Sequence, residues 1–144
     1  MAKIIVLGAG GSASTNYVRS LRLASEKFYI IGTDSNKFYL QRAETDERYL
    51  VPRADDPTYI PTLNGLIKKT GAEFIHAQND AEVATISEQR AMLNIRTFLP
   101  SLLTVSTCQN KWLSRQAWKD AGFEHPQTFL LTNPEDLDKA FQFK

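Results

Sequence analysis

The sequence predicts an α/β fold in which a parallel, open sheet carries helices on both of its faces. Short aliphatic runs alternate along the chain with longer segments of helical periodicity, and a glycine-rich turn follows the first run. Runs that are apolar throughout are typical of strands buried on both faces, and strands that alternate with helices pair in parallel through right-handed crossovers. With 144 residues, the chain is long enough for about one domain with its own core.

Strands are expected where apolar or β-favouring runs end at a turn-forming residue. Lys3–Leu7 is a continuous aliphatic run that stops at Gly8, and Arg48–Val51 stops at Pro52. The expected strands, in chain order, are Lys3–Leu7, Phe28–Thr33, Arg48–Val51, Glu73–Ala77 and, with the weakest pattern, Arg96–Leu99.

Helices are expected where apolar residues recur at a spacing of three and four. In Tyr59–Thr70 the apolar residues share one face, and Lys68 and Lys69 favour the carboxyl end of a helix before Gly71. The expected helices of this part are Ser14–Ala24, Tyr59–Thr70 and one whose amino-terminal cap is Asn79 or Asp80. Together with the strands, these helices predict a Rossmann-like domain.

The alternation of strands and helices stops after Leu99. An amphipathic helix is expected over Asn110–Ala121, and a β-favouring run, Thr128–Leu131, follows it. A last helix is expected to begin at Asn133, since a proline and two acidic residues come next. No stop signal follows before the carboxyl terminus, so we expect the chain to continue beyond Lys144.

Charge and composition exclude several classes of function. Seventeen Lys and Arg residues against sixteen Asp and Glu residues give a net charge of +1, which leaves no basic excess for nucleic acid or for a membrane surface. Neither is therefore expected as a partner. Cys108 is the single cysteine, so we expect no internal disulfide and no zinc cluster. No apolar segment is long enough for a signal peptide or a membrane span, and we expect a cytoplasmic protein.

The glycine-rich turn is the first candidate for chemistry. Gly8, Gly10 and Ala13 match the pattern G-x-G-x-x-A between an expected strand and an expected helix. Small residues let the backbone approach a ligand, the helix after Gly11 offers free N–H groups to an anion, and Ser12 adds a hydroxyl. Any parallel α/β domain also needs small residues at this turn, so a purely structural interpretation stays open.

Asp34 ends the second expected strand, where dinucleotide-binding folds place an acid on a ribose. This position favours an NAD(P)-dependent oxidoreductase or epimerase domain. Against it, none of the five tyrosines is followed four residues later by Lys, so the catalytic pair of the short-chain dehydrogenases is missing. A turn residue that caps the segment after it is the alternative role for Asp34.

Polar residues follow the fourth expected strand, at the edge where open α/β sheets bind ligands. Asn79, Asp80 and Glu82 could orient a substrate there, or they could only cap a helix and fill its first turn. His76, which precedes them inside a strand, is interpreted as a packed histidine.

Lys111 begins the expected helix over Asn110–Ala121, where its charge opposes the helix dipole. A bound phosphate would explain a cation at this place, and an exposed lysine that only contacts solvent is the alternative.

In order and spacing, these segments resemble the amino-terminal part of ATP-grasp ligases, above all the group similar to the carbamoyl-phosphate synthase large chain. The resemblance covers nearly the whole chain. The segments that carry it are Lys3–Gly11, Gly32–Ser35, Ala43–Asp46, Tyr49–Pro52, Asp55–Ile60, Asn79–Glu82, Asn110–Lys111 and Ala121–Thr128.

The resemblance implies a division at residue 107. Residues 1–107 would be the pre-ATP-grasp domain, which shapes one wall of the substrate site, and residues 108–144 would begin the ATP-grasp region. Lys111 would contact the nucleotide, although Asn110 stands where the family usually has Asp. Asp80 and Glu82 would face the acceptor side, and Gly8–Gly11 would lie near the substrate.

The implied reaction transfers the γ-phosphoryl group of ATP, with Mg²⁺, to a carboxylate or bicarbonate, after which an amine or ammonia attacks the acyl phosphate. The remaining nucleotide- and metal-binding groups would belong to a carboxyl-terminal ATP-grasp domain beyond Lys144. We therefore assign no catalytic or metal-ligating residue to this chain, and we expect it to be inert alone and to hold no ATP tightly. An NAD(P)-binding oxidoreductase or epimerase domain and a non-catalytic small-molecule-binding domain are the alternative functions.

Overall fold

The computed structural model describes residues 1–142. The chain forms two compact units, Met1–Leu102 and Leu103–Lys144, and each is described here by itself. The predicted domain boundary at residue 107 stays a prediction.

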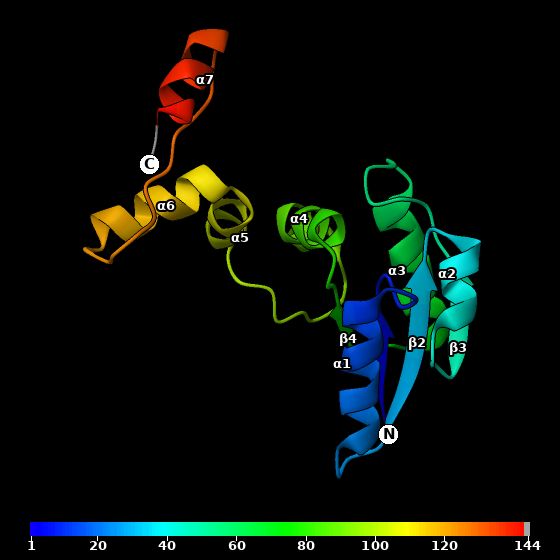
Figure 1. Cartoon of the computed structure of the whole chain (residues 1–144). Helices are drawn as coiled ribbons and strands as arrows, with labels where there is room; N and C mark the ends of the chain where they lie inside the picture. Colours follow the sequence, from blue (N-terminus) through cyan, green and yellow to red (C-terminus); the bar gives the residue numbers. More distant parts are fainter. Residues whose placement is uncertain (143–144) are drawn as a thin grey trace. The chain divides into compact units, whose positions relative to one another are not determined.

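The first unit is built on a parallel sheet of four strands, which are β1 (Ala2–Val6), β2 (Phe28–Asp34), β3 (Glu47–Leu50) and β4 (Phe74–His76). They lie in the order β3-β2-β1-β4 (Figure 1). The chain therefore builds outward from β1 through β2 to β3 and then crosses back to the other side of β1. This reversal makes the space beyond the ends of β1 and β4 the topological switch point, where open α/β sheets bind ligands.

Helices cover both faces of the sheet. They are α1 (Ser12–Leu23), α2 (Lys37–Arg42), α3 (Tyr59–Thr70) and α4 (Asp80–Glu88), with a short 3-10 turn, η1 (Arg90–Met92). The four clearly marked strands and the three helices predicted for this part are thus confirmed to within a few residues, and the Rossmann-like fold is confirmed with them. The short helix α2 lies where only a short connection between strands was expected.

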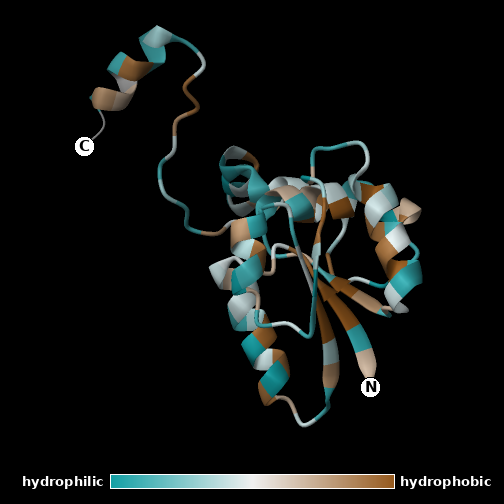
Figure 2. Ribbon diagram, turned by 90° about the vertical axis from the view of Figure 1, so that its right-hand side faces the viewer, coloured by the Kyte–Doolittle hydropathy of each residue, from teal (hydrophilic) through white to brown (hydrophobic). Residues whose placement is uncertain are grey.

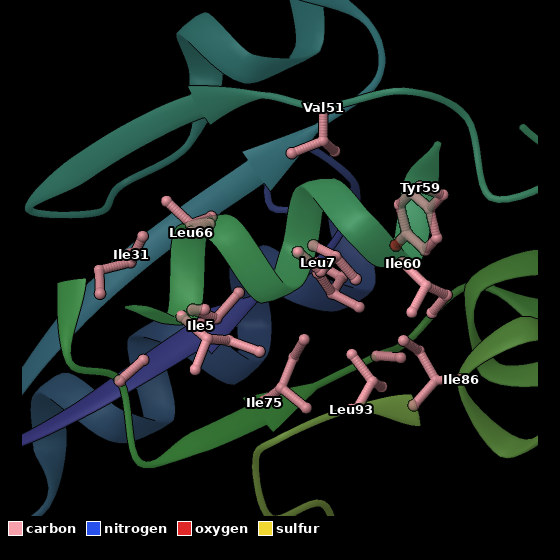
Figure 3. Close-up of a cluster of buried hydrophobic side chains, with 14 residues drawn as sticks. Ile5, Leu7, Ile31, Val51, Tyr59, Ile60, Leu66, Ile75, Ile86 and Leu93 are labelled. Carbon is pink, nitrogen blue, oxygen red and sulfur yellow. The ribbon is translucent and has the colours of Figure 1, made fainter. Parts of the chain in front are cut away.

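Successive side chains of β1 point to opposite faces of the sheet, and this divides the core into two clusters. Ile5 and Leu7 pack with α3 and with residues such as Ile75 and Ile86 (Figure 3), whereas Ile4 and Val6 pack on the other face. In Figure 2 the strands are mainly hydrophobic, whereas the helices carry both hydrophobic and hydrophilic residues. Because both faces are covered, a strand such as Ile4-Ile5-Val6 can be apolar throughout.

The predicted fifth strand over Arg96–Leu99 is wrong. In its place the structure has one isolated bridge, between Phe74 and Arg96, with a hydrogen bond of 2.9 Å from the Ile75 N–H to the Arg96 carbonyl oxygen. Phe98 still places its ring 4.5 Å from that of Phe74 in β4, but it lies 86% exposed and belongs to no strand. A single bridge is too short to make a strand.

The second unit contains α6 (Lys111–Asp120), which confirms the helix predicted there, and α7 (Pro134–Phe141). The helix α5 (Leu102–Gln109), which reaches into this unit, was not predicted. Its β-branched residues and lack of first-turn acids give little helical signal. The β-favouring run over Thr128–Leu131 forms no strand, and the described residues contain a single sheet of four strands.

Helix α7 begins as predicted, with the Asn133 side chain accepting a hydrogen bond of 3.1 Å from the Asp136 N–H. It runs through Phe141, as expected, and residues 143–144 lie outside the described residues. At the cap, the Gln142 N–H bonds the Ala140 carbonyl oxygen.

The loop after β1 contacts α2 backbone to backbone. A Cβ atom added at Gly10 would lie 1.9 Å from the carbonyl oxygen of Tyr39, whereas one added at Gly65, in the middle of α3, would meet nothing within 4 Å. A side chain therefore has no room at Gly10, whereas Gly65 can be replaced by a residue with a side chain.

We expect Gly10→Ala to lower the free energy of unfolding by about 3 kcal/mol or more, because neither backbone can give way without repacking. Gly65→Ala is the matched control. It should raise the free energy of unfolding by about 0.5–1 kcal/mol, since Ala favours an exposed helix interior over Gly. Urea denaturation followed by circular dichroism measures both, and a Gly10→Ala protein as stable as the wild type would contradict the described contact.

Candidate functional site

Polar side chains gather at the carboxyl edge of the sheet, around the switch point between β1 and β4. The loop Gly8–Gly11 joins β1 to α1, Asp34 ends β2, and Asn79 precedes α4 on leaving β4. These residues are up to 71 positions apart in the sequence, and the strand order brings them to one edge.

The loop Gly8–Gly11 is tied to the sheet by its backbone. The Ala9 N–H donates a hydrogen bond to the Thr33 carbonyl oxygen (2.8 Å), and the Gly11 N–H donates one to the Gly8 carbonyl oxygen (2.9 Å). Gly8 has a φ of 53°, in the left-handed region that glycine adopts without strain. Gly11 is the N-cap of α1 and supplies no side-chain acceptor, while Ser12 is exposed in the first turn. The first N–H groups of α1 are therefore suited to an anion.

Asp34 is 7% exposed and holds this edge together. One carboxylate oxygen accepts a hydrogen bond from the Gly10 N–H (3.3 Å), and the other accepts one from the Asn36 N–H (2.8 Å). The two oxygens thus fix the backbone of the loop after β1 and of the residue that caps α2. This is the turn-forming role considered above, and a contact of Asp34 with substrate stays a prediction.

Glu82 lies in the first turn of α4 and is only 6% exposed. One of its carboxylate oxygens accepts a hydrogen bond of 3.0 Å from the Tyr59 hydroxyl, and the other accepts one from the side-chain amide of Asn79. The Asn79 side-chain oxygen in turn accepts the Glu82 N–H (3.0 Å). Asn79 thus caps α4 through its side-chain oxygen, while its side-chain amide holds the carboxylate of Glu82.

Burial raises the pKa of Glu82 to about 7, and the negative charge of Asp34 acts in the same direction. The hydrogen bonds from Tyr59 and Asn79 stabilise the ionised form and lower this pKa, but burial prevails. Burial and the Glu82 charge raise the pKa of Tyr59, so its hydroxyl remains a donor to the carboxylate. Glu82 is therefore an acid that changes its charge near neutral pH.

Gly8 provides the space for this carboxylate. A Cβ atom at Gly8 would lie 2.9 Å from Asn79 Nδ2 and 3.0 Å from Glu82 Oε2. The loop after β1 and the start of α4 are therefore fitted to one another.

A cavity of about 200 Å³ opens beside Glu82. Its lining comes from the residues after β2, from the segment that follows β3 and from the start of α4: Ser35, Arg53, Ala54, Asp55, Asn79, Ala81 and Glu82. Arg53 donates two hydrogen bonds, of 3.1 and 3.2 Å, to the carboxylate of Asp55. Asp80 lies exposed at the start of α4 and is not among the lining residues.

The sequence predictions missed Tyr59, Ser35 and Arg53. Tyr59 was placed only as the first residue of a helix, yet it is fully buried. A buried tyrosine hydroxyl needs a partner, but no spacing in the sequence indicates that the partner is Glu82, 23 positions away.

Lys111 belongs to the second unit, at the first position of α6, whose cap is the side-chain oxygen of Asn110. It lines a separate cavity of about 280 Å³ with residues of α5, α6 and the segment after it: Cys108, Ser114, Arg115, Trp118, Pro126 and Thr128. Lys111 and Arg115 stand one helical turn apart, so two cations face this cavity.

His76, at the end of β4, stacks on the ring of Tyr17 with the ring centres 3.7 Å apart. Burial lowers the pKa of His76, which agrees with its interpretation as a packed histidine. Over residues 1–142, no three His, Cys, Asp or Glu residues stand close enough to hold a metal ion, and no helix has the length and apolar character to cross a membrane.

Comparisons with known proteins bear on the fold. The L-amino acid ligase from Bacillus licheniformis superposes with a TM-score of 0.62 at 8% identity, over 99% of this chain and 42% of that one. The glycinamide-RNase-transformylase T from Mycobacterium tuberculosis gives 0.62 at 17% identity, over 96% and 38%. The biotin carboxylase domain of a single-chain bacterial carboxylase gives 0.63 at 14% identity, over 99% and 34%.

These three proteins are members of the ATP-grasp family. The chain shares its Rossmann-like fold with their amino-terminal domains and spans about a third to two fifths of their length. A dTDP-glucose 4,6-dehydratase from Bacillus anthracis, solved with NAD, superposes with a TM-score of only 0.49, over 67% of this chain and 36% of that one at 18% identity. No protein-family profile and no curated protein sequence matches the chain.

The raised pKa of Glu82 predicts that stability falls as the pH rises. Between its ordinary value of 4.5 and about 7, the folded protein holds a proton that the unfolded chain has released, so ionisation costs the folded state about 3 kcal/mol by the time the pH has passed the folded pKa. We expect Glu82→Gln to lose less stability than the wild type between about pH 5 and pH 8. Urea denaturation of both proteins at the two pH values measures this loss of stability.

Glu88→Gln, on the exposed end of α4, is the control, and it should keep the pH dependence of the wild type. An equal loss of stability in Glu82→Gln and the wild type would show that the Glu82 pKa is not raised.

Proposed function

We propose that this chain is the amino-terminal part of an ATP-dependent ligase of the ATP-grasp family, and that its sheet edge forms the substrate side of the active site. The observation that carries the proposal is the extent of the structural likeness. It runs over 96–99% of the chain in the three ATP-grasp proteins and so includes the helices after the sheet unit. The likeness to the carbamoyl-phosphate synthase large chain comes from the sequence segments alone.

The reaction would form a bond between a carboxylate, or bicarbonate, and an amine or ammonia. A carboxylate oxygen bonds to the γ-phosphorus of ATP while ADP leaves with the electron pair of the broken P–O bond, which gives an acyl phosphate. The amine nitrogen then bonds to the acyl carbon and loses a proton to solvent, while phosphate leaves with the electron pair of the broken C–O bond. ATP supplies the activation when it is bound. Residues of this chain would bind and orient the reactants, which is the main contribution of proteins to phosphoryl transfer.

Lys111 would contact the nucleotide phosphates. The residues around it fit such a ligand, because Lys111 and Arg115 place two cations on one face of α6 and Trp118 adds an aromatic surface to the same cavity. By the resemblance, the ligands of Mg²⁺ would belong to the ATP-grasp domain beyond Lys144.

At the sheet edge, the N–H groups at the start of α1 and the loop Gly8–Gly11 would lie beside the carboxylate substrate or its acyl phosphate, and the start of α4 with Asp80 and Glu82 would face the amine. An anion at the helix start is favoured by the free N–H groups there.

An NAD(P)-binding oxidoreductase or epimerase domain is the second candidate. Its support is the pattern of Gly8, Gly10 and Ala13 with Asp34 at the end of β2. The burial of Asp34 and its two hydrogen bonds to backbone weigh against a contact with ribose. A non-catalytic small-molecule-binding domain would use the cavity beside Glu82.

The sequence that follows Lys144 in the gene tests the proposal first, since it should encode the rest of an ATP-grasp domain. In the protein that includes it, we expect formation of ADP and phosphate that depends on a carboxylate and an amine. Residues 1–144 alone should show no ATP turnover, and turnover by this chain, or a continuation of another class, would contradict the proposal.

We expect Lys111→Ala to weaken binding of ATP about tenfold or more in that protein, because it removes a charge-assisted contact to phosphate. Lys119→Ala, in the last turn of the same helix, is the matched control and should leave the affinity within about twofold. Isothermal titration measures both, and a parallel titration with NADH distinguishes the second candidate, which predicts micromolar binding.

A further inference from the structure

A second cavity of the first unit opens beside the edge of β4 that faces away from β1. It has a volume of about 400 Å³, within the range of about 300–1,000 Å³ that is typical of small-molecule sites. Its lining comes from the start of β4, from η1 and from the segment after η1: Phe74, Arg90, Ile95, Arg96, Thr97 and Phe98. This cavity shares no lining residue with the one beside Glu82.

The isolated bridge sets the direction of the side chains around this cavity. Phe74 and Arg96 are the two residues of the bridge, and residues that stand opposite one another on paired chains point to the same face. Phe98, two positions after Arg96, returns to that face, and its ring centre lies 4.5 Å from that of Phe74. Two aromatic rings thus form one wall of the cavity, and Phe98 remains largely exposed there.

Two arginines bring positive charge to this aromatic wall. The Nη2 of Arg90 donates a hydrogen bond to the Pro100 carbonyl oxygen, which holds the guanidinium in place. The Nε of Arg90 is buried and has no acceptor among the described residues, and a buried donor without a partner costs free energy that an acceptor would restore. Arg96 is exposed. Neither arginine takes part in an ion pair of the described chain.

The remaining polar group of the lining can also donate a hydrogen bond. The hydroxyl oxygen of Thr97 accepts a hydrogen bond of 3.5 Å from the Leu99 N–H, so its own O–H is left to donate. The lining lies wholly within the described residues and contains no acidic side chain. Positive charge and hydrogen-bond donors therefore stand beside aromatic and aliphatic surface.

We propose that this cavity binds a small molecule that carries a carboxylate on a flat, apolar body. The two oxygens of a carboxylate match the parallel N–H groups of a guanidinium, which Arg90 and Arg96 supply. The flat body packs on the rings of Phe74 and Phe98 and removes the exposed Phe98 ring from water. A cationic ligand would meet like charge, and a carboxylate without an apolar body would leave the aromatic wall in water.

This inference goes beyond the proposed function and does not depend on it. All of the lining residues belong to the unit Met1–Leu102, and neither ATP nor the reactants of a ligase enter the test. A chain that proves not to be part of a ligase would keep this site, and a failure to bind the carboxylate would leave the ligase proposal to its own tests.

The experiment is a titration of the ¹⁵N-labelled full chain with sodium 2-naphthoate at constant ionic strength, followed by the amide resonances. We expect saturable shifts of the backbone amides of Arg90, Thr97 and Phe98 and of the Arg90 Nε–H. Two matched probes separate the parts of the ligand: 2-naphthalenemethanol has the same rings without the charge, and sodium acetate has the carboxylate without the rings. Each should bind at least about tenfold more weakly than 2-naphthoate.

Arg96→Gln should weaken the binding of 2-naphthoate at least about tenfold, because it removes a cation that no acidic side chain of the lining neutralises. Phe98→Ala should weaken it about three- to tenfold through loss of the aromatic contact. Arg42→Gln, at the exposed end of α2, removes the same charge outside the cavity and should bind within about twofold of the wild type.

Arg96 and Phe98 are both exposed, and the spectra themselves report whether each variant is folded. Any of three results would overturn the proposal. They are the absence of saturable shifts at Arg90, Thr97 and Phe98 in the wild type, binding of 2-naphthalenemethanol as tight as that of 2-naphthoate, and binding of 2-naphthoate by Arg96→Gln as tight as by the wild type.

Discussion

The burial of the Glu82 carboxylate is the constraint on which the edge of the sheet depends. An ionisable group taken out of water needs hydrogen-bond partners, since an unpaired buried charge costs several kcal/mol. Its partners come from separate parts of the chain, Tyr59 from the start of α3 and Asn79 from the residue before α4. To satisfy this one group, the ends of two helices must be held at fixed positions, and Gly8 must leave room between them.

The strand order explains why these groups meet. Because β4 lies beside β1 and not beside β3, the loop after β1 and the start of α4 come from neighbouring strands that run in the same direction. The segment after β3 reaches the same edge through Arg53 and Asp55. The candidate site is thus a product of one reversal in the order of strands, and its polar residues come from the segments that follow β2, β3 and β4.

The sequence was a good guide where a local rule decides the structure. Apolar runs such as Lys3–Leu7 and the glycine pattern at Gly8 and Gly10 fix strands and turns within a few residues, and Asn79, Asn110 and Asn133 cap the helices that follow them. Prediction failed where a remote partner decides. Residues 128–131 have β propensity, but a strand forms only when another strand pairs with it. At Arg96 the pairing with β4 stops after one bridge, so no fifth strand forms.

For the candidate site, the same distinction holds. Position after a strand indicated Asp34, Asn79 and Glu82, because the carboxyl ends of parallel strands share an edge. The sequence could not show that both carboxylate oxygens of Asp34 accept hydrogen bonds from backbone N–H groups, nor that the Tyr59 hydroxyl donates one to Glu82. Both facts depend on packing between elements. Lys111 was indicated by its place at a helix start, and its neighbour Arg115 in the same cavity was not.

The contact between Gly10 and the backbone of Tyr39 also bears on how a ligand would be received. A loop pressed against a helix and tethered through Asp34 has few conformations to lose, so little entropy would be surrendered when a molecule docks on it. The binding site at this edge would then be preorganised. Its selectivity would come from the shape and charge that it has before the ligand binds.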